Sequence, residues 1–477
     1  MPLATRRLDE LLEMKFSNSN ARAARRCCAM LGIAISARGQ SISGLQSAIK
    51  ERTGQQIEWR KDAGTDERVA QAVHGLLRRT LTADTAVRIA LLNNRELQAT
   101  FEKIGIANAD LIEAGLLKNP AFEASPRFPD KPPGGTDLEL SVAQDFLDLI
   151  MLPLRKKVAA QELARTELEV GDAVLKLAAD TKIAFYQLQE AEQSLAATKA
   201  VDEASAAAMQ LTRRLHAAGN ISDLELANEE AATSQSKVDV MAAELEIESA
   251  REKLNRLMSL WGDDLGWKAA DELPPLPSTE PPQRRLEAIA ISRRLDLAAT
   301  EAEWRGVVQA LGITRTYRYA GTVELGVDTE NQTDNQRITG PTLRLELPIF
   351  NRGQGRVARL DAQLREVERR VEAEAIEIRS EVREAAARAE EQRNLALYYR
   401  DELCPERKRI LDLTTTQYNA MLKGGYDLVL AKQNELAARQ GYIQTLRDYW
   451  IARAELERAI GGGGGNLSTG EPRQVLH

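Results

Sequence analysis

The sequence has few residues of the kinds that build catalytic and metal sites. Its 477 residues include only three cysteines and three histidines. The histidines His74, His216 and His477 are scattered along the chain. No CxxC, P-loop, GxSxG or HExxH pattern occurs. We therefore expect no enzyme, no cofactor and no metal site.

Long apolar runs and aromatic side chains are scarce too. No run of 18 or more apolar residues occurs, so we expect no helix that spans a bilayer. Aromatic residues make up 4% of the chain, which suits Ala-, Leu-, Glu- and Arg-rich helices better than a large globular core. The 64 basic and 71 acidic residues are mixed, with a net charge of −7. No concentrated basic excess predicts nucleic-acid binding.

The first 40 residues resemble a secretory signal. Basic residues after Met14 precede an apolar run from Cys27 to Ala37, which is the order that export signals use. Initiation at Met14 fits this interpretation better than initiation at Met1, because acidic residues occur before Met14. An ordinary N-terminal helix is the alternative. Export would leave Cys404 as the single cysteine. The polar residues 41–80 show little periodicity and are predicted to form an extended lead-in.

A long stretch without proline, between Pro153 and Pro274, dominates the sequence. Apolar residues recur at alternating spacings of four and three in 170–195 and again in 240–261, which is a heptad pattern. Gly219 between them supplies a helix stop, and Ser222 or Asp223 supplies the next N-cap. This pattern predicts an antiparallel helical hairpin over 156–261, with its turn at Gly219.

Two strands are predicted before this hairpin. A helix capped by Thr82 or Asp84 is expected to run towards Leu117. Apolar and polar residues then alternate within residues 120–146, on both sides of a Pro- and Gly-rich turn, which predicts two paired strands. We expect Pro153 to mark the junction between the second strand and the long helix.

The same plan occurs a second time. Ala90 and Leu97 correspond to Ala290 and Leu297, and Gly219 corresponds to Gly424. We infer a first repeat over 81–273, a Pro-rich linker over 274–285 and a second repeat over 286–461. The second repeat contains strands within 318–347, joined by a polar loop over 328–341. It also contains a hairpin over 354–460 that Pro405 should kink. Residues 462–477 should form a flexible Gly-rich tail.

The four predicted strands have two unlike faces and need partners for their open edges. Each alternates strictly between charged or polar and apolar side chains, and both edges of a four-stranded sheet would stay open. A closed barrel in lipid satisfies the edges and gives each face a suitable environment. One chain has too few strands, so several copies must combine. The predicted fold class is mainly α-helical, with a membrane β-barrel portion and a duplicated protomer.

Several short motifs then occur in a characteristic order over about residues 80–461. This order resembles the TolC family of outer-membrane efflux channels. The resemblance implies a homotrimer with a 12-stranded β-barrel, continued by an α-helical barrel through the periplasm. It also implies contact with outer-membrane lipid, a periplasmic adaptor protein and an inner-membrane efflux pump. The motifs are Ala90-Leu91-Leu92-Asn93-Asn94, Asn119-Pro120, Leu347-Pro348-Ile349-Phe350 and Tyr418-Asn419-Ala420-Met421.

The resemblance assigns gating and adaptor docking to the two hairpin tips. The alternative is that their Gly and Asp residues only turn and cap the helices. Two family features have no counterpart here: Leu430 and Gln433 stand where acidic residues often follow the second tip, and no lipidated cysteine follows the signal. The tip residues are Gly219, Asn220, Ser222, Asp223, Gly424, Gly425, Tyr426 and Asp427.

The strands supply the remaining candidates. The charged residues should face the barrel lumen, although any water-filled barrel needs a polar inner face. Pro153 and Pro348 should mark strand-to-helix junctions. The lumen candidates are Glu123, Arg127, Glu139, Glu324, Arg344 and Glu346, and the candidates for interfacial aromatic belts are Phe122, Phe128, Phe146, Tyr319 and Phe350.

The sequence thus predicts an outer-membrane channel of a tripartite efflux system. A soluble coiled-coil scaffold is the competing hypothesis, but a scaffold needs neither alternating strands nor an export signal. The transported substrate is not predicted.

Overall fold

The computed structural model describes residues 43–128, 130, 136–277, 285–319, 321–332 and 336–463. The predicted signal over 1–40, residues 278–284 of the predicted linker and the tail beyond residue 463 lie outside these residues. The chain divides into two compact units, Met1–Gly44 and Leu45–His477. Every element named below lies in the second unit, except the first two residues of α3. Among the described helices, none combines the length and the hydrophobicity that crossing a membrane requires.

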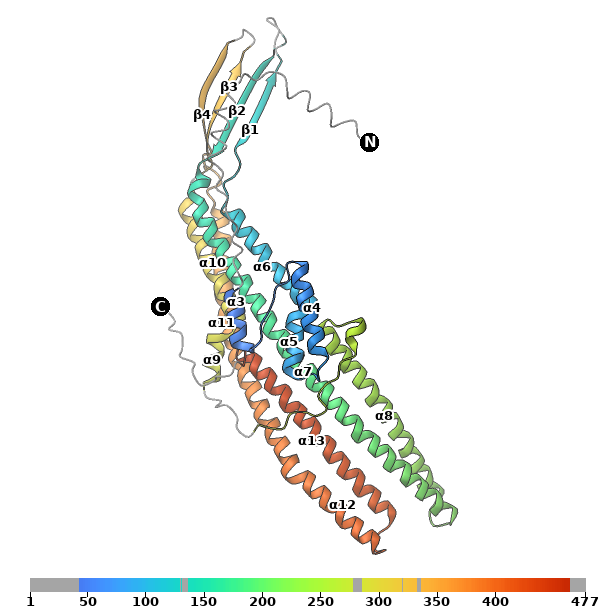
Figure 1. Cartoon of the computed structure of the whole chain (residues 1–477). Coiled ribbons are helices and arrows are strands. Elements are labelled where there is room, and N and C mark those ends of the chain that lie inside the picture. The colour runs from blue at the N-terminus through green and yellow to red at the C-terminus, as the bar shows by residue number, and fades with distance from the viewer. Residues whose placement is uncertain are drawn as a thin grey trace, which may run out of the picture. The chain divides into compact units, whose positions relative to one another are not determined.

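Two similar halves follow one another along the second unit (Figure 1). Each half contains a broken helix, a pair of strands and a long helical hairpin. The first half comprises α5 (Ala83–Asn93), α6 (Arg95–Ala114), β1 (Ala121–Arg127), β2 (Asp137–Asp145), α7 (Leu147–Ala217) and α8 (Asp223–Met258). The second comprises α9 (Leu286–Arg293), α10 (Leu295–Tyr317), β3 (Val323–Asn331), β4 (Arg337–Leu345), α11 (Gln354–Tyr398), α12 (Cys404–Asn419) and α13 (Gly425–Ala459).

The helix expected to run from residue 82 to Leu117 is broken at Asn94, so that expectation was wrong. Asn94 adopts φ −60° and ψ 119°, and its side-chain oxygen accepts a hydrogen bond from the Leu97 N–H at 2.8 Å. Its Nδ2 donates to the Leu257 carbonyl at 2.9 Å, and Asn93 Nδ2 donates to the Met258 carbonyl at 2.8 Å. The break therefore supplies partners for the last carbonyls of α8, which have none within their own helix.

The second half repeats this break at Arg294. Its backbone adopts φ −63° and ψ 130°, close to the conformation of Asn94. The guanidinium donates to Asp296 Oδ2 at 2.6 Å and to the Ala459 carbonyl at 3.4 Å, at the end of α13. In both halves, a polar side chain at the break thus holds the end of the long hairpin against the broken helix. This shared geometry supports the internal duplication.

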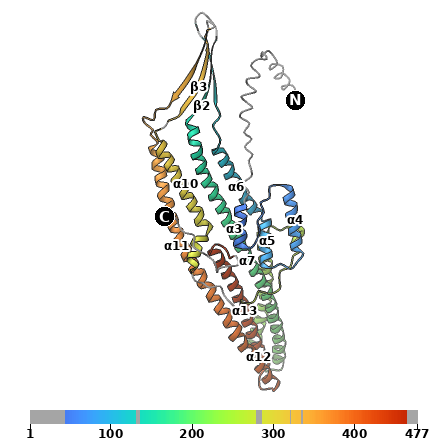
Figure 2. The same cartoon turned by 60° about the vertical axis from the view of Figure 1, so that its left-hand side comes forward.

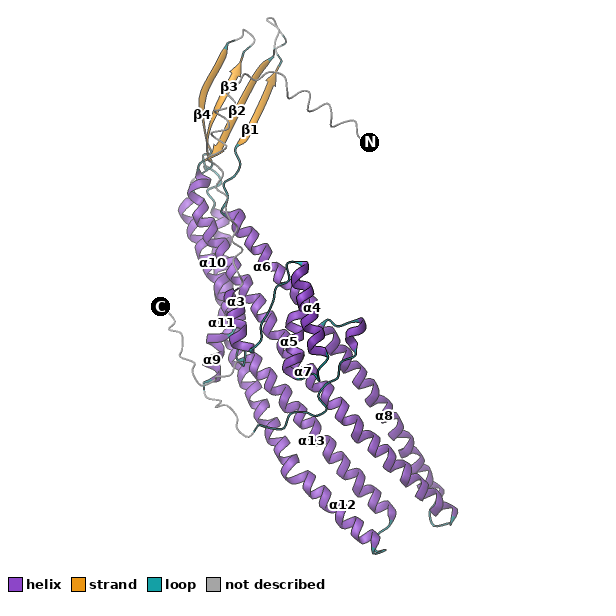
Figure 3. Ribbon diagram, viewed as in Figure 1, coloured by secondary structure: helices purple, strands orange, loops and turns teal. Residues whose placement is uncertain are grey.

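The four strands form one antiparallel sheet in the order β1-β2-β3-β4 (Figure 3). The Phe146 N–H donates to the Val323 carbonyl at 2.8 Å, which links the two halves at the end of the sheet nearest the helices. The predicted polar loop 328–341 was too long, because β3 continues to Asn331 and β4 begins at Arg337. Polar side chains extend this pairing across the two strands. Thr342 Oγ1 donates to Asp328 Oδ1 at 2.7 Å, and the Thr329 and Thr339 hydroxyls also contact each other.

Pro153 does not mark the strand-to-helix junction. The helix α7 begins six residues earlier at Leu147 and contains Pro153. Asp145 explains the early start, because its Oδ1 accepts hydrogen bonds from the N–H groups of Leu147 at 3.0 Å and Asp148 at 3.4 Å. Pro153 costs one helical hydrogen bond without ending the helix. Pro348, by contrast, lies between β4 and α11, where the prediction placed it.

The helix α7 is the central element of the unit. Its 71 residues correspond to a length of about 105 Å at 1.5 Å per residue. It packs against α5, α6, α8, α10 and α13. Its buried stripe includes Val170, Val174, Thr181, Ala184 and Leu188, which are predicted heptad positions. The strands lie at one end of the unit and the hairpin turns at the other, as the view turned by 60° also shows (Figure 2).

The heptad pattern of α8 ends earlier than predicted. Ser259 adopts a left-handed conformation with φ 51° and ends the helix. Trp261, which was expected in the hairpin, is 79% exposed, whereas Trp267 is buried. The Trp267 indole N–H donates to Asn255 Oδ1 at 2.9 Å, and the Arg251 guanidinium lies over the ring at 4.3 Å from its centroid.

Residues 41–80 are not an extended lead-in. They contain the helices α3 (Ser43–Thr53) and α4 (Ala63–Leu77). Asp62 caps α4 by accepting a hydrogen bond from the Thr65 N–H at 2.7 Å, and Val69 and Val73 bury one face of the helix against the core around α5 and α7. Because α4 buries few residues, its helical periodicity is weak in the sequence.

The second hairpin is interrupted close to Pro405, as predicted. A π-helical turn, Tyr399–Leu403, separates α11 from α12, and Pro405 lies in the first turn of α12. Proline cannot continue the hydrogen-bond ladder of the preceding turn, which is consistent with a wider turn at this point. The Tyr399 ring occupies the space beside Gly441 of α13, where a Cβ would lie 2.7 Å from the ring.

The beginning of the glycine tail is packed rather than free. Gly461 and Gly462 are buried with φ +83° and +105°. A Cβ on Gly461 would lie 2.9 Å from the Arg293 carbonyl carbon, and a Cβ on Gly462 would lie 2.8 Å from Arg52 Cβ. The predicted start of a flexible tail at residue 462 was therefore wrong by at least one residue, because glycine is needed for a close crossing of α9 and α3.

Candidate functional site

The charged residues proposed for a channel lumen share one face of the sheet. The strand register aligns Glu324 with Arg344, and side chains two residues apart along a strand point to the same side. Two ion pairs lie on this face: Arg127 contacts Glu139 at 2.7 Å, and Arg344 contacts Glu324 at 3.0 Å. The register places all six candidates on this face, which are Glu123, Arg127, Glu139, Glu324, Arg344 and Glu346.

This face is strongly acidic. In the described strands and the paired residue Glu346, eight carboxylates accompany only the two arginines. Four of these carboxylates were predicted from the sequence and four were not, although the alternation of period two could have indicated them. The four that were not predicted are Asp137, Asp145, Asp328 and Glu330. We call this surface the acidic face.

The opposite face of the sheet exposes many apolar side chains, although the register also places polar residues such as Arg337 and Thr329 on it. Phe122 is aligned with Val142, and Leu325 with Leu343. The exposed fraction is 68% for Phe122 and 59% for Leu343. Each large exposed side chain of this kind would lose about 1.5–3 kcal/mol of burial free energy by remaining in water. The apolar side chains of this face therefore favour an apolar environment, which the described residues of one chain do not provide.

The first tip (residues 217–223) is a tightly capped turn. Gly219 adopts φ +74°, and the Asn220 N–H donates to the Leu215 carbonyl at 2.9 Å. Ser222 Oγ accepts from the Glu225 N–H at 3.3 Å, and Glu225 Oε2 accepts from the Ser222 N–H at 2.8 Å. The hydrogen bonds that the Ser222 N–H and the Ser222 hydroxyl donate to Glu225 Oε2 lower the pKa of Glu225. The S-x-x-E pattern signals this capping box, so Glu225 could have been predicted.

Asp223 makes a second contact in the first tip. Its Oδ1 lies 2.7 Å from His216 Nε2, in the last turn of α7. The contact joins the two limbs of the hairpin across the turn. The turning and capping roles of Gly219, Ser222 and Asp223 are therefore visible in the structure, and any further role in gating or docking stays a prediction.

The second tip (residues 419–427) has a different turn from the one predicted. Met421, not Gly424, is the left-handed residue, with φ +60°. Gly424 is the N-cap of α13, and its N–H donates to Asp427 Oδ2 at 3.2 Å. Gly424 therefore corresponds to Ser222 of the first tip, so matching it to Gly219 was wrong. Gly425, Tyr426 and Asp427 form the first turn of α13 rather than the turn of the hairpin.

The second tip exposes apolar side chains. Met421 is 93% exposed and Leu422 is 76% exposed, and Tyr426 in the first turn of α13 is 65% exposed. Tyr426 was a predicted tip residue, whereas Met421 was named only as part of a family motif and Leu422 was not named. The apolar character of the Met421-Leu422 pair, located in a turn, could have indicated them, because exposed apolar groups of this kind mark interaction surfaces.

The two hairpins touch along α7 and α13. A Cβ on Gly425 would lie 2.3 Å from Leu211 Cδ2, so glycine permits close approach near the tips. Further along, Gln433 Nε2 donates to Ser205 Oγ at 3.4 Å, and Gln440 Nε2 donates to Ser194 Oγ at 3.1 Å. Gln433 stands where family members often have an acidic residue. In this structure its side chain forms a contact between the two hairpins.

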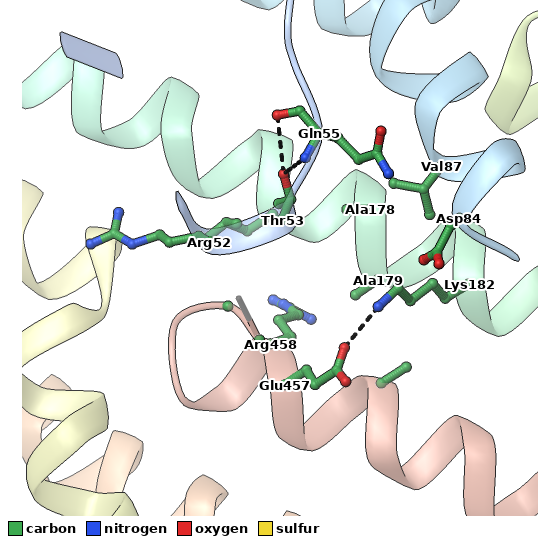
Figure 4. A pocket seen from close by; sticks show the side chains of 14 residues that line it. Arg52, Thr53, Gln55, Asp84, Val87, Ala178, Ala179, Lys182, Glu457 and Arg458 are labelled. Atoms are coloured by element: carbon green, nitrogen blue, oxygen red, sulfur yellow. Dashed lines mark hydrogen bonds and ion pairs between the residues drawn. The ribbon is translucent and has the colours of Figure 1, made fainter. Parts of the chain in front are cut away.

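This contact zone continues into the body of the unit. The Arg447 guanidinium lies 2.9 Å from Glu190, and Lys182 Nζ lies 2.8 Å from Glu457. Figure 4 shows the second pair at the edge of a small cavity between α3, α5, α7 and α13. The cavity measures about 50 Å³, which is room for a few water molecules. We assign it a structural role.

Outer faces of both hairpins carry apolar stripes. On α8, Val238, Met241 and Leu245 are exposed at helical spacing. On α12, Ile410 and Leu413 are exposed, and no residue of that helix is buried. Such stripes are suited to packing against another helix. Within the described part of the chain, no group of three or more His, Cys, Asp or Glu side chains is placed to hold a metal ion.

Comparison with known proteins gives a consistent result. No family model matches the chain. The cobalt-zinc-cadmium resistance protein CzcC of Cupriavidus metallidurans is 22% identical over 391 residues, which cover 80% of this chain and 90% of CzcC.

Several solved structures share the fold. The CmeC outer membrane channel of Campylobacter jejuni superimposes with a TM-score of 0.69 at 18% identity, over 81% of this chain and 87% of CmeC. The outer membrane protein VceC of Vibrio cholerae has a TM-score of 0.63 at 15% identity, over 84% of this chain and 97% of VceC. A CusC structure has a TM-score of 0.67 at 17% identity, over 80% of this chain and 92% of CusC. The chain therefore shares its fold with these solved outer-membrane channel proteins, which is the fold that the resemblance to the TolC family implied.

Proposed function

We propose that this protein is the outer-membrane channel of a tripartite efflux system. It lies in the outer membrane and extends into the periplasm. Three copies combine into one passive channel, through which substrates leave the cell. An inner-membrane pump supplies the driving force, and a periplasmic adaptor protein connects the pump to the channel.

The sheet is the observation that carries this proposal. It has an acidic face, an exposed apolar face and open edges at β1 and β4. A nine-residue strand extends about 30 Å at 3.3 Å per residue, close to the thickness of the hydrocarbon core. Closing the sheet with strands from other copies pairs both edges, turns the apolar face to lipid and leaves the acidic face in water.

The hairpins support the trimer. In a ring of copies, the exposed stripe of α8 in one copy comes to lie against the α12 stripe of the next copy. Helix pairing of this kind buries Met241, Leu245, Ile410 and Leu413 together. The contact is heterologous, and such contacts close into a ring when the rotation between copies is a whole fraction of a turn. Three copies give twelve strands, the number that the family resemblance implies.

The tips are the proposed contact with the adaptor. The pair Met421 and Leu422, together with Tyr426, presents apolar and aromatic side chains at the end of the second hairpin. Aromatic and Met residues are favoured at protein interfaces. Opening of the channel requires the second hairpin to move away from α7, which breaks the contacts of Gln433 with Ser205 and of Gln440 with Ser194.

Cations are the proposed substrate class. CzcC is named for resistance to cobalt, zinc and cadmium. The acidic face of this chain carries eight carboxylates against two arginines, and three copies would triple this excess inside one barrel. Rings of carboxylates favour cations in a channel. The acidic face therefore supports passage of metal cations without a fixed binding site.

One experiment separates this proposal from the soluble coiled-coil scaffold. Washed membranes from cells that express the full chain are treated with salt, with carbonate and then with detergent. The proposal predicts release by detergent alone, and a purified protein with three times the mass of one chain after correction for bound detergent. Recovery in the soluble fraction, or a monomer in detergent, would refute the channel.

A further inference from the structure

A band of cations lies where the strands meet the helices. It covers residues 111–118, 147–158, 312–319 and 347–361, which precede β1, follow β2, precede β3 and follow β4. Nine basic side chains lie in this band against three acidic ones. Three of the basic residues contact carboxylates: Arg155 contacts Asp148 at 2.7 Å, Arg315 contacts Asp361 at 2.6 Å, and Lys118 contacts Asp145 at 3.6 Å.

Six cations remain exposed without a carboxylate within 4.0 Å among the described residues. We call them the basic belt. Only Glu113 remains as an exposed carboxylate without a cation partner in the same band. Arg318 lies over the Tyr319 ring, and Arg352 donates to the Ile349 carbonyl. The members are Lys156, Lys157, Arg318, Arg352, Arg356 and Arg359.

The basic belt follows directly after an apolar belt. Phe146, Leu149 and Ile150 are exposed at the start of α7, and Leu347 and Phe350 are exposed after β4. Phe350 is 91% exposed. By the alternation of the strands, Phe146 and Leu347 continue the apolar face of the sheet, and the other three side chains follow them closely along the chain. Lys156 follows Ile150 by six residues, which is about 9 Å along a helix.

This spacing matches one side of a membrane. The polar headgroup layer on each side of the hydrocarbon core is about 5–8 Å thick. If the apolar belt lies at the edge of the hydrocarbon, the basic belt lies at the level of the phosphates. Aromatic rings prefer the boundary between these layers, and long Lys and Arg side chains reach headgroups from a short distance away.

We propose that the basic belt binds the phosphates of anionic phospholipids in the leaflet that faces the periplasm. This inference rests on the proposed membrane location and adds a specific lipid class to it. The partner is identified by its chemistry, because the belt presents six cations next to an apolar surface. A soluble anion would be attracted to the cations but would leave the neighbouring Phe350 and Ile150 uncovered. A phospholipid covers both surfaces at once.

The test measures lipid selectivity at the surface of the intact channel. The full-length protein is reconstituted in phosphatidylcholine vesicles with spin-labelled phosphatidylglycerol or spin-labelled phosphatidylcholine, and the motionally restricted fraction of each label is compared. We expect association of phosphatidylglycerol to exceed that of phosphatidylcholine about threefold at low salt. The ratio should fall towards one in 1 M salt, because screening weakens exposed charge contacts.

Two quadruple variants make the test specific. Lys156→Gln, Lys157→Gln, Arg356→Gln and Arg359→Gln together should bring the selectivity ratio close to one. The matched control replaces four exposed cations far from the belt, Lys237→Gln, Arg379→Gln, Lys408→Gln and Arg409→Gln, and should keep the wild-type ratio. If the belt variant does not assemble, the separate pairs Lys156→Gln/Lys157→Gln and Arg356→Gln/Arg359→Gln should each lower the ratio in part.

The outcomes also distinguish this inference from the proposed function. Equal association of both lipids with the wild type, or an unchanged ratio in the belt variant, would overturn the headgroup site while the channel itself stands. Absence of any motionally restricted lipid would instead mean that the protein has no lipid-facing surface, and both proposals would fail.

Discussion

Asp172 on α7 is a carboxylate whose charge the fold disfavours. Burial, followed by the nearby charge of Asp296, raises its pKa above 3.8, although Arg458 and Arg294 oppose the shift. A carboxylate with a raised pKa binds more protons in the folded state than in the unfolded state. Stability therefore decreases as the pH rises from about 4 through the raised pKa.

Asp172→Asn removes this cost. The variant should raise the free energy of unfolding by about 1 kcal/mol at pH 7.5 and by less at pH 4, where more of the wild-type carboxyl is protonated. Thermal unfolding followed by circular dichroism at the two pH values measures this difference. Asp110→Asn, on the exposed surface of α6, is the control and should change neither value. Equal stabilisation by Asp172→Asn at both pH values would show that the charge is not the cause.

Gly326 is required by the close pairing of β2 and β3. A Cβ at this position would lie 2.6 Å from the Val142 carbonyl oxygen, which is part of the backbone and has little freedom to move. Gly340 is the natural control, since it lies on the same face with its nearest neighbour, Asp328 Oδ1, at 4.0 Å. Gly326→Ala should destabilise the sheet by about 1–3 kcal/mol, and Gly340→Ala should not.

The yield of assembled protein extracted from membranes, together with its thermal midpoint in detergent, would measure this effect. Indistinguishable behaviour of Gly326→Ala and Gly340→Ala would contradict the observed register of β2 and β3.

Prediction from the sequence was least reliable at single residues. Gly424 was matched to Gly219 because both are glycines near a hairpin turn, but the chain places Met421 in the left-handed conformation instead. Few patterns predict a Met with positive φ, because the conformation is unfavourable for a side chain of this size. The capping box of Ser222 and Glu225, in contrast, depends on local sequence alone and could have been predicted.

At the scale of elements, α7 and α13 form the contact that gating would have to break. Ser205 and Gln433 are opposite each other across it. In a Cys404→Ala background, Ser205→Cys and Gln433→Cys should form a disulfide that holds the second hairpin against α7. We expect the oxidised protein to show a much smaller conductance in planar bilayers, and reduction should restore the conductance.

The cross-link needs a control and has a clear contradicting outcome. The single variants Ser205→Cys and Gln433→Cys control for the substitutions themselves. Conductance and transport that stay unchanged while the disulfide is fully formed would show that the second hairpin does not move away from α7 on opening.

Elements with a strong period were predictable, and elements that depend on distant partners were not. The alternation of β1 to β4 and the heptad positions of α7 correctly indicated strands and a long helix. The break at Asn94 could not be found in the same way, since it depends on the carbonyls of Leu257 and Met258, which are more than 160 residues away. The prediction that Pro153 marks the start of the long helix was also wrong. The side chain of Asp145 caps the helix, which therefore begins before the proline.

At the scale of the whole molecule, the acidic face should control ion selectivity. Arg127→Gln and Arg344→Gln together remove the two cations of this face and should strengthen the preference for cations. Glu123→Gln and Glu330→Gln together should weaken it. The reversal potential of the purified channel in a planar bilayer with a tenfold KCl gradient measures the preference. We expect each double variant to shift the reversal potential by several millivolts, in opposite directions.

A shift in the same direction for both pairs, or no shift for either, would mean that the acidic face does not line the conducting path. The sequence predicted six of these charged positions, but the strength of the acidic excess became visible only with the strand register.

The number of copies in the assembly cannot be read from the structure of a single chain. The apolar stripes of α8 and α12 and the open edges of the sheet show what must be covered. The resemblance to TolC-family channels suggests that sister copies and lipid cover them. The fold was therefore predictable from the sequence to a large extent. The sequence pattern of each helix, strand pair and hairpin occurs in both repeats, so that one repeat supports the prediction for the other. The assembly depends on surfaces that are completed only between copies.

The accessibility of alternate residues along β2 in native membranes tests the membrane location of the sheet most directly. Single cysteines replace Glu139, Leu140, Ser141 and Val142 in turn in a Cys404→Ala background, and a small, charged, water-soluble thiol reagent is applied to intact washed membranes. If the sheet lies in lipid with its acidic face in water, Glu139→Cys and Ser141→Cys are labelled, and Leu140→Cys and Val142→Cys are protected. Equal labelling at all four positions would contradict this location, because both faces of the sheet would then be in water.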